Sequence, residues 1–270
     1  MYDAILRATA LCCTLMLLSP ASWAAGCSAA SGNARIPLLE LYTSEGCDSC
    51  PPTDQWVSTL PQRGYTTARV VTLAFHVDYW NYLGWTDPYA QAAFSARQRE
   101  SNRRNRARVV YTPQLILDGA DYRRALFRDD FGERVAAVNK QKPRAHIHLA
   151  IAGSASKPRL QGRITVPAMA DRDTAGIYVA VYENGLTTDV RSGENRGKKL
   201  AHDFVVREMT GPLALDAAGI VSFERPLPVP GGGKTARLHV AAFAQDRATG
   251  TTLQALALPY CLNVQDISRQ

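Results

Sequence analysis

The chain has 270 residues, of which 46% are hydrophobic, and this is enough for one large core or two ordinary ones. Its 15 prolines and 19 glycines are ordinary for loop-rich α/β or all-β proteins and exclude a disordered chain. The formal net charge of +7 permits attraction to anions, but no nucleic-acid motif or phosphate-binding glycine loop accompanies it, so we expect neither a nucleic-acid partner nor nucleotide chemistry.

The first 25 residues have the pattern of a secretory signal peptide. A short charged segment precedes an apolar run over residues 8–18, which is too short to span a bilayer, and cleavage is expected near Ala24 or Ala25. We therefore expect a periplasmic or secreted protein without a stable membrane span. In an alternative, residues 24–27 resemble a bacterial lipobox and Cys27 carries a lipid anchor.

In the first half of the mature chain, strand-like and helix-like segments alternate. Strands are predicted at 36–43, 69–77 and 114–117, and helices at 51–60, 88–105 and 129–140. Because helices that connect strands favour parallel pairing through crossovers, this half is typical of an α/β domain, which we place at residues 34–142.

The pattern changes after the polar segment 141–144, where helical periodicity fades. Alternating strands are predicted at 146–152, 160–166, 176–183, 204–208, 219–223, 236–244 and 252–257. Asn184-Gly185 is a strong hairpin signal. Short strands at this spacing are typical of an antiparallel β-sandwich, which we place at residues 145–262.

The most informative motif is the Cys-Asp-Ser-Cys sequence at residues 47–50, between the first predicted strand and the helix that begins at Pro51. Two thiols at this spacing can close a small disulfide. The free N–H groups of the helix N-terminus favour the thiolate of Cys47, whereas Glu45 and Asp48 place negative charge beside it and oppose this effect. A CxxC motif between a strand and a helix predicts redox chemistry.

Removal of the signal peptide leaves four cysteines, an even number that suits an oxidising compartment. Cys47 and Cys50 are the natural local pair. We therefore expect a structural disulfide between Cys27 and Cys261, which lie near the two ends of the mature chain. In the chain-entropy model, closing so long a loop stabilises the fold by about 4–5 kcal/mol.

The order of strands and helices, with CxxC at the first strand–helix turn, resembles the thioredoxin-like superfamily. A second match is the run 111–119, Tyr-Thr-Pro-Gln-Leu-Ile-Leu-Asp-Gly. The resemblance implies that the peptide bond before Pro113 is cis and that this proline faces the CxxC motif, the alternative being an ordinary trans proline. It also implies the fold class, an α/β thioredoxin-like domain followed by an antiparallel β-sandwich-like domain.

Longer runs in both halves resemble a family of secreted bacterial proteins catalogued as a domain of unknown function, DUF1223. They are residues 41–52, 74–85, 192–197 and 202–208. Because they are long and lie in both halves, the resemblance covers most of the mature chain. It implies a fold and a compartment but supplies no substrate.

The resemblance to thioredoxin-like proteins implies that Cys47 is the attacking thiolate and Cys50 the resolving thiol. At the end of the second predicted strand, His76 and Asp78 are candidate proton shuttles for Cys50. The alternatives are a buried structural histidine and a turn-capping aspartate. The aromatic residues of the loop 79–89 either form a substrate groove or cover the core.

Together these residues predict an exported thiol–disulfide oxidoreductase that acts on protein thiols or disulfides, needs a redox partner and uses no dissociable cofactor or metal. One alternative is a copper-binding or other metal-binding envelope protein with Cys47, Cys50 and His76 as ligands. The other is a non-catalytic binding protein in which the CxxC disulfide is structural.

Overall fold

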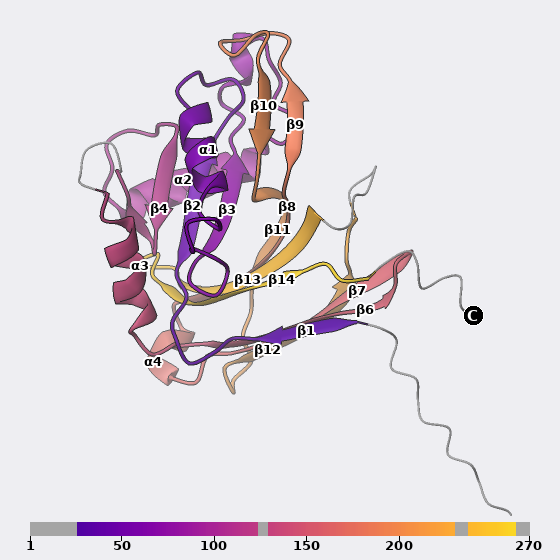
Figure 1. Ribbon diagram of the computed structural model, residues 1–270. Coiled ribbons are helices and arrows are strands. Elements are labelled where there is room, and N and C mark those ends of the chain that lie inside the picture. Colours follow the sequence, from indigo (N-terminus) through magenta and orange to yellow (C-terminus); the bar gives the residue numbers. More distant parts are fainter. Residues whose placement is uncertain (1–25, 124–128, 230–236, 263–270) are drawn as a thin grey trace, which may run out of the picture.

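The structure is a computed structural model, and it describes residues 26–123, 129–229 and 237–262 (Figure 1). The predicted signal peptide lies outside these residues. Within the described part of the chain, no helix is long and apolar enough to cross a membrane.

Eight strands form one large mixed sheet at the centre of the molecule. They are β2 (Leu38–Thr43), β3 (Val71–His76), β4 (Gln114–Leu117), β5 (Ala120–Asp121), β8 (Ala175–Glu183), β11 (Val205–Leu213), β13 (Leu238–Asp246) and β14 (Thr252–Pro259). Their order across the sheet is β14-β13-β8-β11-β3-β2-β4-β5. The strands of the two chain halves therefore lie in a single sheet.

Six further strands form two smaller units. The antiparallel strands β1 (Cys27–Ala30), β6 (His146–Ser154), β7 (Lys157–Thr165) and β12 (Ile220–Pro226) make a four-stranded sheet in the order β1-β6-β7-β12. The strands β9 (Leu186–Asp189) and β10 (Lys199–His202) pair as a separate hairpin, which lies beside α1 (Pro51–Ser58) in Figure 1.

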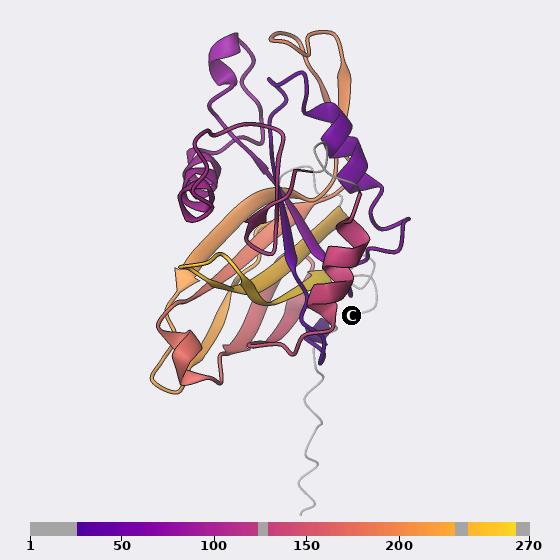
Figure 2. The same cartoon turned by 90° about the vertical axis from the view of Figure 1, so that its left-hand side faces the viewer.

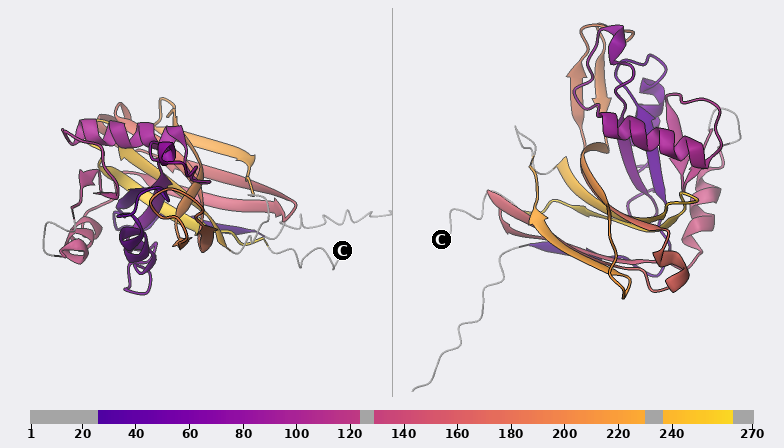
Figure 3. Two further views of the ribbon diagram at one scale, coloured as in Figure 1. Left: turned by 90° about the horizontal axis from the view of Figure 1, so that it is seen from above. Right: turned by 180° about the vertical axis from the view of Figure 1, so that it is seen from behind.

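The remaining helices are the 3₁₀ turn η1 (Asn81–Leu83), α2 (Ala92–Arg104), α3 (Phe131–Asn139) and α4 (Met169–Arg172). Figure 2 shows α2 on one face of the β2–β3 region, with α1 and α3 on the opposite face. In the right-hand view of Figure 3, which is seen from behind, α2 lies across these strands. Covered on both faces, β2 and β3 are buried at every position, which explains their unbroken apolar runs.

Parallel pairing joins the two halves of the chain at β3. On one side β2 is parallel to β3, with Leu41 opposite Ala74, and α1 provides the crossover. On the other side β11 is parallel to β3, with Val205 opposite Ala74, and the Ala74 N–H donates to the carbonyl of Phe204 over 2.8 Å. β11 is then antiparallel to β8, so the ladder continues into the second half.

The fold class expected from the sequence, an α/β thioredoxin-like domain followed by an antiparallel β-sandwich-like domain, is therefore wrong. The chain is 40% strand and 17% helix, and its main sheet runs without a break from β5 to β14. Strands from both sides of residues 142–145 lie in this sheet. The physical reason is that a strand edge offers unpaired N–H and C=O groups, and local periodicity does not reveal which distant strand pairs with them.

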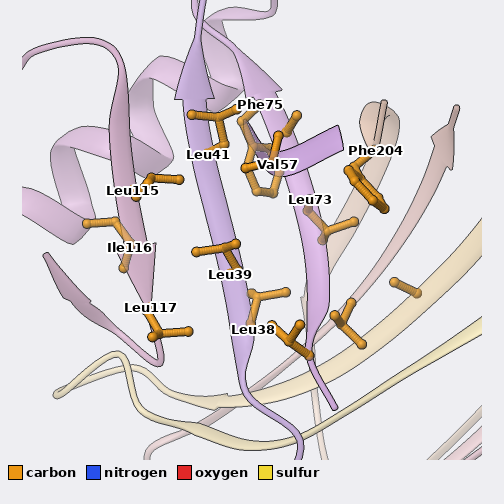
Figure 4. Packing of buried hydrophobic residues seen from close by; sticks show 14 of the residues in the cluster. Leu38, Leu39, Leu41, Val57, Leu73, Phe75, Leu115, Ile116, Leu117 and Phe204 are labelled. Atoms are coloured by element: carbon orange, nitrogen blue, oxygen red, sulfur yellow. The ribbon is translucent and has the colours of Figure 1, made fainter. Parts of the chain in front are cut away.

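Two hydrophobic cores lie against the large sheet. The first surrounds β2, β3 and β4 and reaches Phe204 in the second half of the chain (Figure 4). The second fills the space between the large sheet and the four-stranded sheet. β8 serves both cores because its side chains alternate: Val179 and Val181 enter the second core, whereas Ala180 and Tyr182 enter the first.

The predicted disulfide between Cys27 and Cys261 is confirmed, with the two Cα atoms 6.1 Å apart. It joins β1, at the edge of the four-stranded sheet, to the segment that follows β14. The Cys27 sulfur, to which a lipid would be attached, is engaged in this bond.

A buried ion pair connects α2 to the large sheet. The Arg97 Nε donates to Glu40 Oε2 over 2.7 Å, and the two side chains are only 8% and 2% exposed. Three aromatic rings surround the guanidinium, those of Phe75, Tyr178 and Phe243, at 5.6, 5.0 and 5.3 Å from their centroids. The pair therefore contacts β2, β3, β8 and β13 at once.

Replacing Arg97 by Met should destabilise the protein by about 3–5 kcal/mol, because it leaves the Glu40 carboxylate buried without its cation. The double variant Arg97→Met, Glu40→Gln should lose clearly less than the single variant, since no unpaired charge remains. Urea unfolding followed by circular dichroism measures both. Arg99→Met, at an exposed position of the same helix, is the control. A loss below about 1 kcal/mol for Arg97→Met would show that the pair contributes no more than a surface contact.

Candidate functional site

The CxxC motif closes a disulfide at the N-terminus of α1, as the sequence predicts. The Cα atoms of Cys47 and Cys50 are 5.5 Å apart, and the Cys50 carbonyl accepts the first N–H groups of the helix, from Thr53 and Asp54. Both cysteines are buried, at 1% and 0% exposure, while the two residues between them are exposed. Contact with another thiol therefore requires local movement of this loop.

The Thr112–Pro113 peptide bond is cis, which confirms that expectation. Trp80 connects this bond to the CxxC loop. Its Nε1 donates to Thr112 Oγ1 over 2.7 Å, and its Cβ lies so close to Gly46 that a Cβ at that position would be only 3.0 Å away. Glycine before the first cysteine thus allows Trp80 to pack between the two segments.

His76 and Asp78, the predicted proton shuttles, point to different partners. The His76 ring is buried, and its Nδ1 lies 2.7 Å from Asp87 Oδ2. Burial alone would lower the pKa of His76, but the charge and hydrogen bond of Asp87 outweigh it, and the pKa is raised above its usual value. Asp78 instead accepts a hydrogen bond from Ser95 on α2, 2.5 Å away, and so connects the end of β3 to that helix.

Sequence reasoning missed a second neighbour of His76, which is His202 at the end of β10. The two rings meet edge to face with centroids 4.9 Å apart, and both are buried. His202 Nε2 lies 3.1 Å from Glu45 Oε1, and His202 Nδ1 lies 4.0 Å from Asp54 Oδ2. As an isolated histidine in the sequence, His202 gave no local sign of this position.

Glu45 and Asp87 hold the loop before the CxxC motif in place. Asp87 Oδ2 accepts the backbone N–H of Glu45 over 2.9 Å, and Glu45 Oε2 accepts the indole N–H of Trp85 over 2.8 Å. Burial would raise the pKa of Asp87, but His76 and the backbone N–H groups of Glu45 and Tyr89 lower it below its usual value. Asp87 therefore stays ionised beside the histidine.

Asp54 is the carboxylate of this cluster whose protonation is most perturbed. Burial raises its pKa from 3.8 to about 6, although His202, His76 and a 3.1 Å hydrogen bond from Thr43 Oγ1 favour the ionised form. Asp54 lies on α1 four residues after Cys50, where side chains share a helix face and lean toward the N-terminus. A buried carboxylate with a pKa near neutrality is characteristic of functional sites.

A cleft of about 300 Å³ leads from the surface to this cluster, between α1 and β10. Asp54 and His202 line it together with Pro51, Gln55, Ser58 and the neighbours of His202. Two buried nitrogens of the cluster, His76 Nε2 and His202 Nδ1, have no hydrogen-bond partner in the described structure. The cluster therefore has unused proton-binding capacity next to a route to solvent.

The segment between β9 and β10 covers the CxxC loop. The buried Asn195 amide donates to the carbonyls of Glu45 and Cys47, over 2.8 and 2.9 Å. Glu194 Oε2 accepts the backbone N–H of Asp48 over 3.0 Å. The second half of the chain thus supplies both the cover of the motif and one of the two histidines beneath it.

The copper alternative places Cys47, Cys50 and His76 around one metal ion. In residues 26–123, 129–229 and 237–262, no three His, Cys, Asp or Glu side chains are grouped so that they could hold a metal ion. His76, the third ligand expected from the sequence, directs its Nδ1 to Asp87.

Two solved structures resemble this chain. The crystal structure of protein AGR_C_4864 from Agrobacterium tumefaciens has 26% sequence identity and a TM-score of 0.59, and the match covers 86% of this chain and 97% of that one. HBP35 of Porphyromonas gingivalis has 12% identity and a TM-score of 0.64, and the match covers 85% of this chain and 76% of that one, which is a likeness of fold alone.

The chain has no significant match among curated proteins. A family model described as a protein of unknown function, DUF1223, matches residues 38–245. These include the CxxC motif, both histidines of the cluster and residues 190–198, the segment between β9 and β10. The chain therefore belongs to the DUF1223 family.

Proposed function

We propose that the protein is a thiol–disulfide oxidoreductase of the periplasm or the cell exterior, with Cys47 and Cys50 as its redox pair. The observation that carries the proposal is the placement of this disulfide at a helix N-terminus, between Glu45 and Asp54, two members of a buried cluster of two histidines and three carboxylates. A disulfide that serves only as a staple has no need of a buried carboxylate with a pKa of about 6 on the adjoining helix. The second disulfide and the signal-peptide pattern of the sequence support an oxidising compartment.

The exchange reaction balances without a cofactor. In the reduced protein, the Cys47 thiolate attacks one sulfur of a partner disulfide, a mixed disulfide forms, and the first partner thiolate leaves. The Cys50 thiolate then attacks the Cys47 sulfur and releases the second partner thiolate. The partner gains two electrons, Cys47 and Cys50 lose two and close their disulfide, and a second thiol partner is needed to reset the protein.

The proton of Cys50 needs an internal acceptor, because this residue is fully buried. Asp54 is the titratable group on the same helix face, and with a pKa of about 6 it is mostly ionised at neutral pH and able to accept the proton. His202, between Asp54 and Glu45, lies where the proton can pass on to the cleft. We assign Asp54 as the proton acceptor and His202 as its positioning partner.

A second candidate function is favoured by the burial of both cysteines, which is usual for structural disulfides. In that case the protein is a binding protein and the CxxC disulfide only holds the loop together. The two candidates differ in the redox potential of the pair.

The reduction potential of the Cys47–Cys50 pair should lie at roughly −270 to −120 mV, the range of thiol–disulfide exchange proteins. Equilibration of the mature protein against glutathione buffers, with mass spectrometry of the alkylated peptides, measures this pair separately from Cys27–Cys261. A Cys27→Ser, Cys261→Ser variant provides the matched control. A potential well below about −300 mV would establish a structural bridge and remove the oxidoreductase proposal.

Asp54→Asn should lengthen the lifetime of the mixed disulfide on Cys47 by roughly tenfold to a hundredfold, since the Cys50 thiol loses its acceptor. In the wild type the resolving rate should rise with pH through about 6, the pKa of Asp54, and the variant should lack this rise. Acid quenching and mass spectrometry at several pH values measure the lifetime. Asp48→Asn, an exposed carboxylate in the same motif, should keep the rise. Unchanged kinetics in Asp54→Asn would exclude Asp54 as the acceptor.

Asp54 should also make the fold less stable as the pH rises. Its pKa is about 6 in the folded protein and 3.8 in the unfolded chain, so the folded state holds the proton more tightly. The stabilisation is complete below the unfolded pKa and is lost as the pH rises through the folded one. Asp54→Asn should therefore be more stable than the wild type near neutral pH by about 2–3 kcal/mol, but not at about pH 4. Urea unfolding of both proteins at both pH values measures the difference in their free energies of unfolding. A variant as stable as the wild type near neutral pH would refute the raised pKa of Asp54.

A further inference from the structure

A second pocket, on the outer side of the CxxC loop, is not used by the exchange steps described above. The segment between β9 and β10 folds back on η1 and forms an open, shallow pocket of about 440 Å³ there. Its lining residues are Leu83, Arg191, Ser192, Gly193, Glu194 and Arg196. The walls thus come from two regions that are about a hundred residues apart in the sequence.

The pocket has a fixed frame. Ser192 Oγ donates to the carbonyl of Gly84 over 2.6 Å. Gly193 has a φ of +73°, and a Cβ there would be 3.2 Å from the Cβ of Trp85, so glycine allows both the turn and the close approach. Asn195, fully buried, fixes the other end of the segment to the CxxC loop.

The pocket is also joined to the CxxC loop by hydrogen bonds. Glu194, one of its lining residues, accepts the N–H of Asp48, and the next residue donates to the carbonyl of Cys47. A molecule bound in the pocket would therefore lie beside the loop in which Cys47 must become accessible.

Arg191 and Arg196 give the pocket its charge. Both side chains are exposed, and neither guanidinium has an ion pair or a hydrogen bond in the described structure. Other arginines of the second half of the chain are paired, such as Arg207 with Glu183 and Arg159 with Glu224. Glu194, an acid that also lines the pocket, directs one carboxylate oxygen to the Asp48 N–H. Two unpaired guanidinium groups in one frame are suited to a carboxylate, which accepts paired N–H bonds from arginine.

We infer that this pocket binds a carboxylate of the substrate, so that the protein prefers thiols and disulfides that carry a carboxylate close to the sulfur. The inference rests on the proposed function and names the substrate class of the same site. Leu83, with the 79% exposed Tyr82 before it, offers an apolar wall for the carbon chain between the carboxylate and the sulfur. Both a small glutathione-type thiol and a cysteine flanked by Glu or Asp in a protein have this chemistry.

Three small disulfides of similar size test the preference. They are 3,3′-dithiodipropionate, 2-hydroxyethyl disulfide and cystamine, which are anionic, neutral and cationic. The reduced wild-type protein should react with the anionic compound roughly threefold to tenfold faster than with the neutral one, and slowest with the cationic one, and added salt should reduce the difference. Equal rates with all three would overturn the inference.

The double variant Arg191→Gln, Arg196→Gln should lose the preference while it keeps the rate with 2-hydroxyethyl disulfide. Arg163→Gln is the control, since it removes a charge of the same sign from an exposed position of β7, in the four-stranded sheet. A preference that persists in the double variant would place its origin outside the pocket. Glutathione disulfide and a disulfide-linked peptide with Glu beside Cys represent the small-molecule source and the protein source of the carboxylate. The compound that reacts faster with the wild type, and loses this advantage in the double variant, identifies the substrate.

Failure of the proposed function would be seen separately. If the reduced wild type reacts with none of the disulfides, the exchange proposal falls. The pocket is then tested with S-methylglutathione, which has carboxylates and cannot exchange, by calorimetry on the oxidised protein. Binding by the wild type that is at least roughly fivefold weaker in the double variant supports a carboxylate site, and equal or absent binding overturns it.

Discussion

The parallel pairing of β11 with β3 brings the second half of the chain to the CxxC region. Val205 lies opposite Ala74, so the residues just before β11 are placed beside the end of β3. This register brings His202, from the end of β10, against the ring of His76. It also directs the β9–β10 hairpin over the CxxC loop, where Asn195 holds the carbonyl of Cys47. One parallel strand contact therefore connects the halves of the chain and completes the candidate site.

Two buried groups of charged side chains in this protein differ in how many of their polar atoms have hydrogen-bond partners. Glu40 and Arg97 form a direct pair inside an aromatic cage, and the guanidinium also donates to Gln245. In the cluster of His76, His202, Glu45, Asp54 and Asp87, by contrast, His202 Nδ1 has no hydrogen-bond partner in the described structure and Asp54 has a pKa of about 6. An arrangement that lowers stability at neutral pH and is open to solvent through a cleft is the arrangement expected of a site that moves protons.

Two features would control thiol–disulfide exchange, namely the burial of Cys47 and the segment 190–198 that bonds to its loop. Glu194 and Asn195 bond to the backbone of the CxxC loop, in which the buried Cys47 must move to meet a partner sulfur. The same segment carries Arg191 and Arg196 on its outer side. Recognition of a carboxylate and release of the loop would then involve one structural element, which gives the second half of the chain a role in the chemistry of the first.

The local features could be read from the sequence, namely the CxxC motif before a proline-opened helix and the apolar runs of β2 and β3. The Cys27–Cys261 pairing followed from counting the cysteines, and the cis bond at Pro113 from the resemblance to thioredoxin-like proteins. Sequence reasoning named His76 and Asp78 as alternative proton shuttles, and in the structure Asp78 bonds to Ser95 on α2. The continuous sheet, and with it the positions of His202, Asn195 and the two arginines, emerges only in the folded chain. The physical reason is that periodicity and turn signals report on neighbours within a few residues, whereas strand pairing is fixed by hydrogen bonds and packing between segments more than a hundred residues apart.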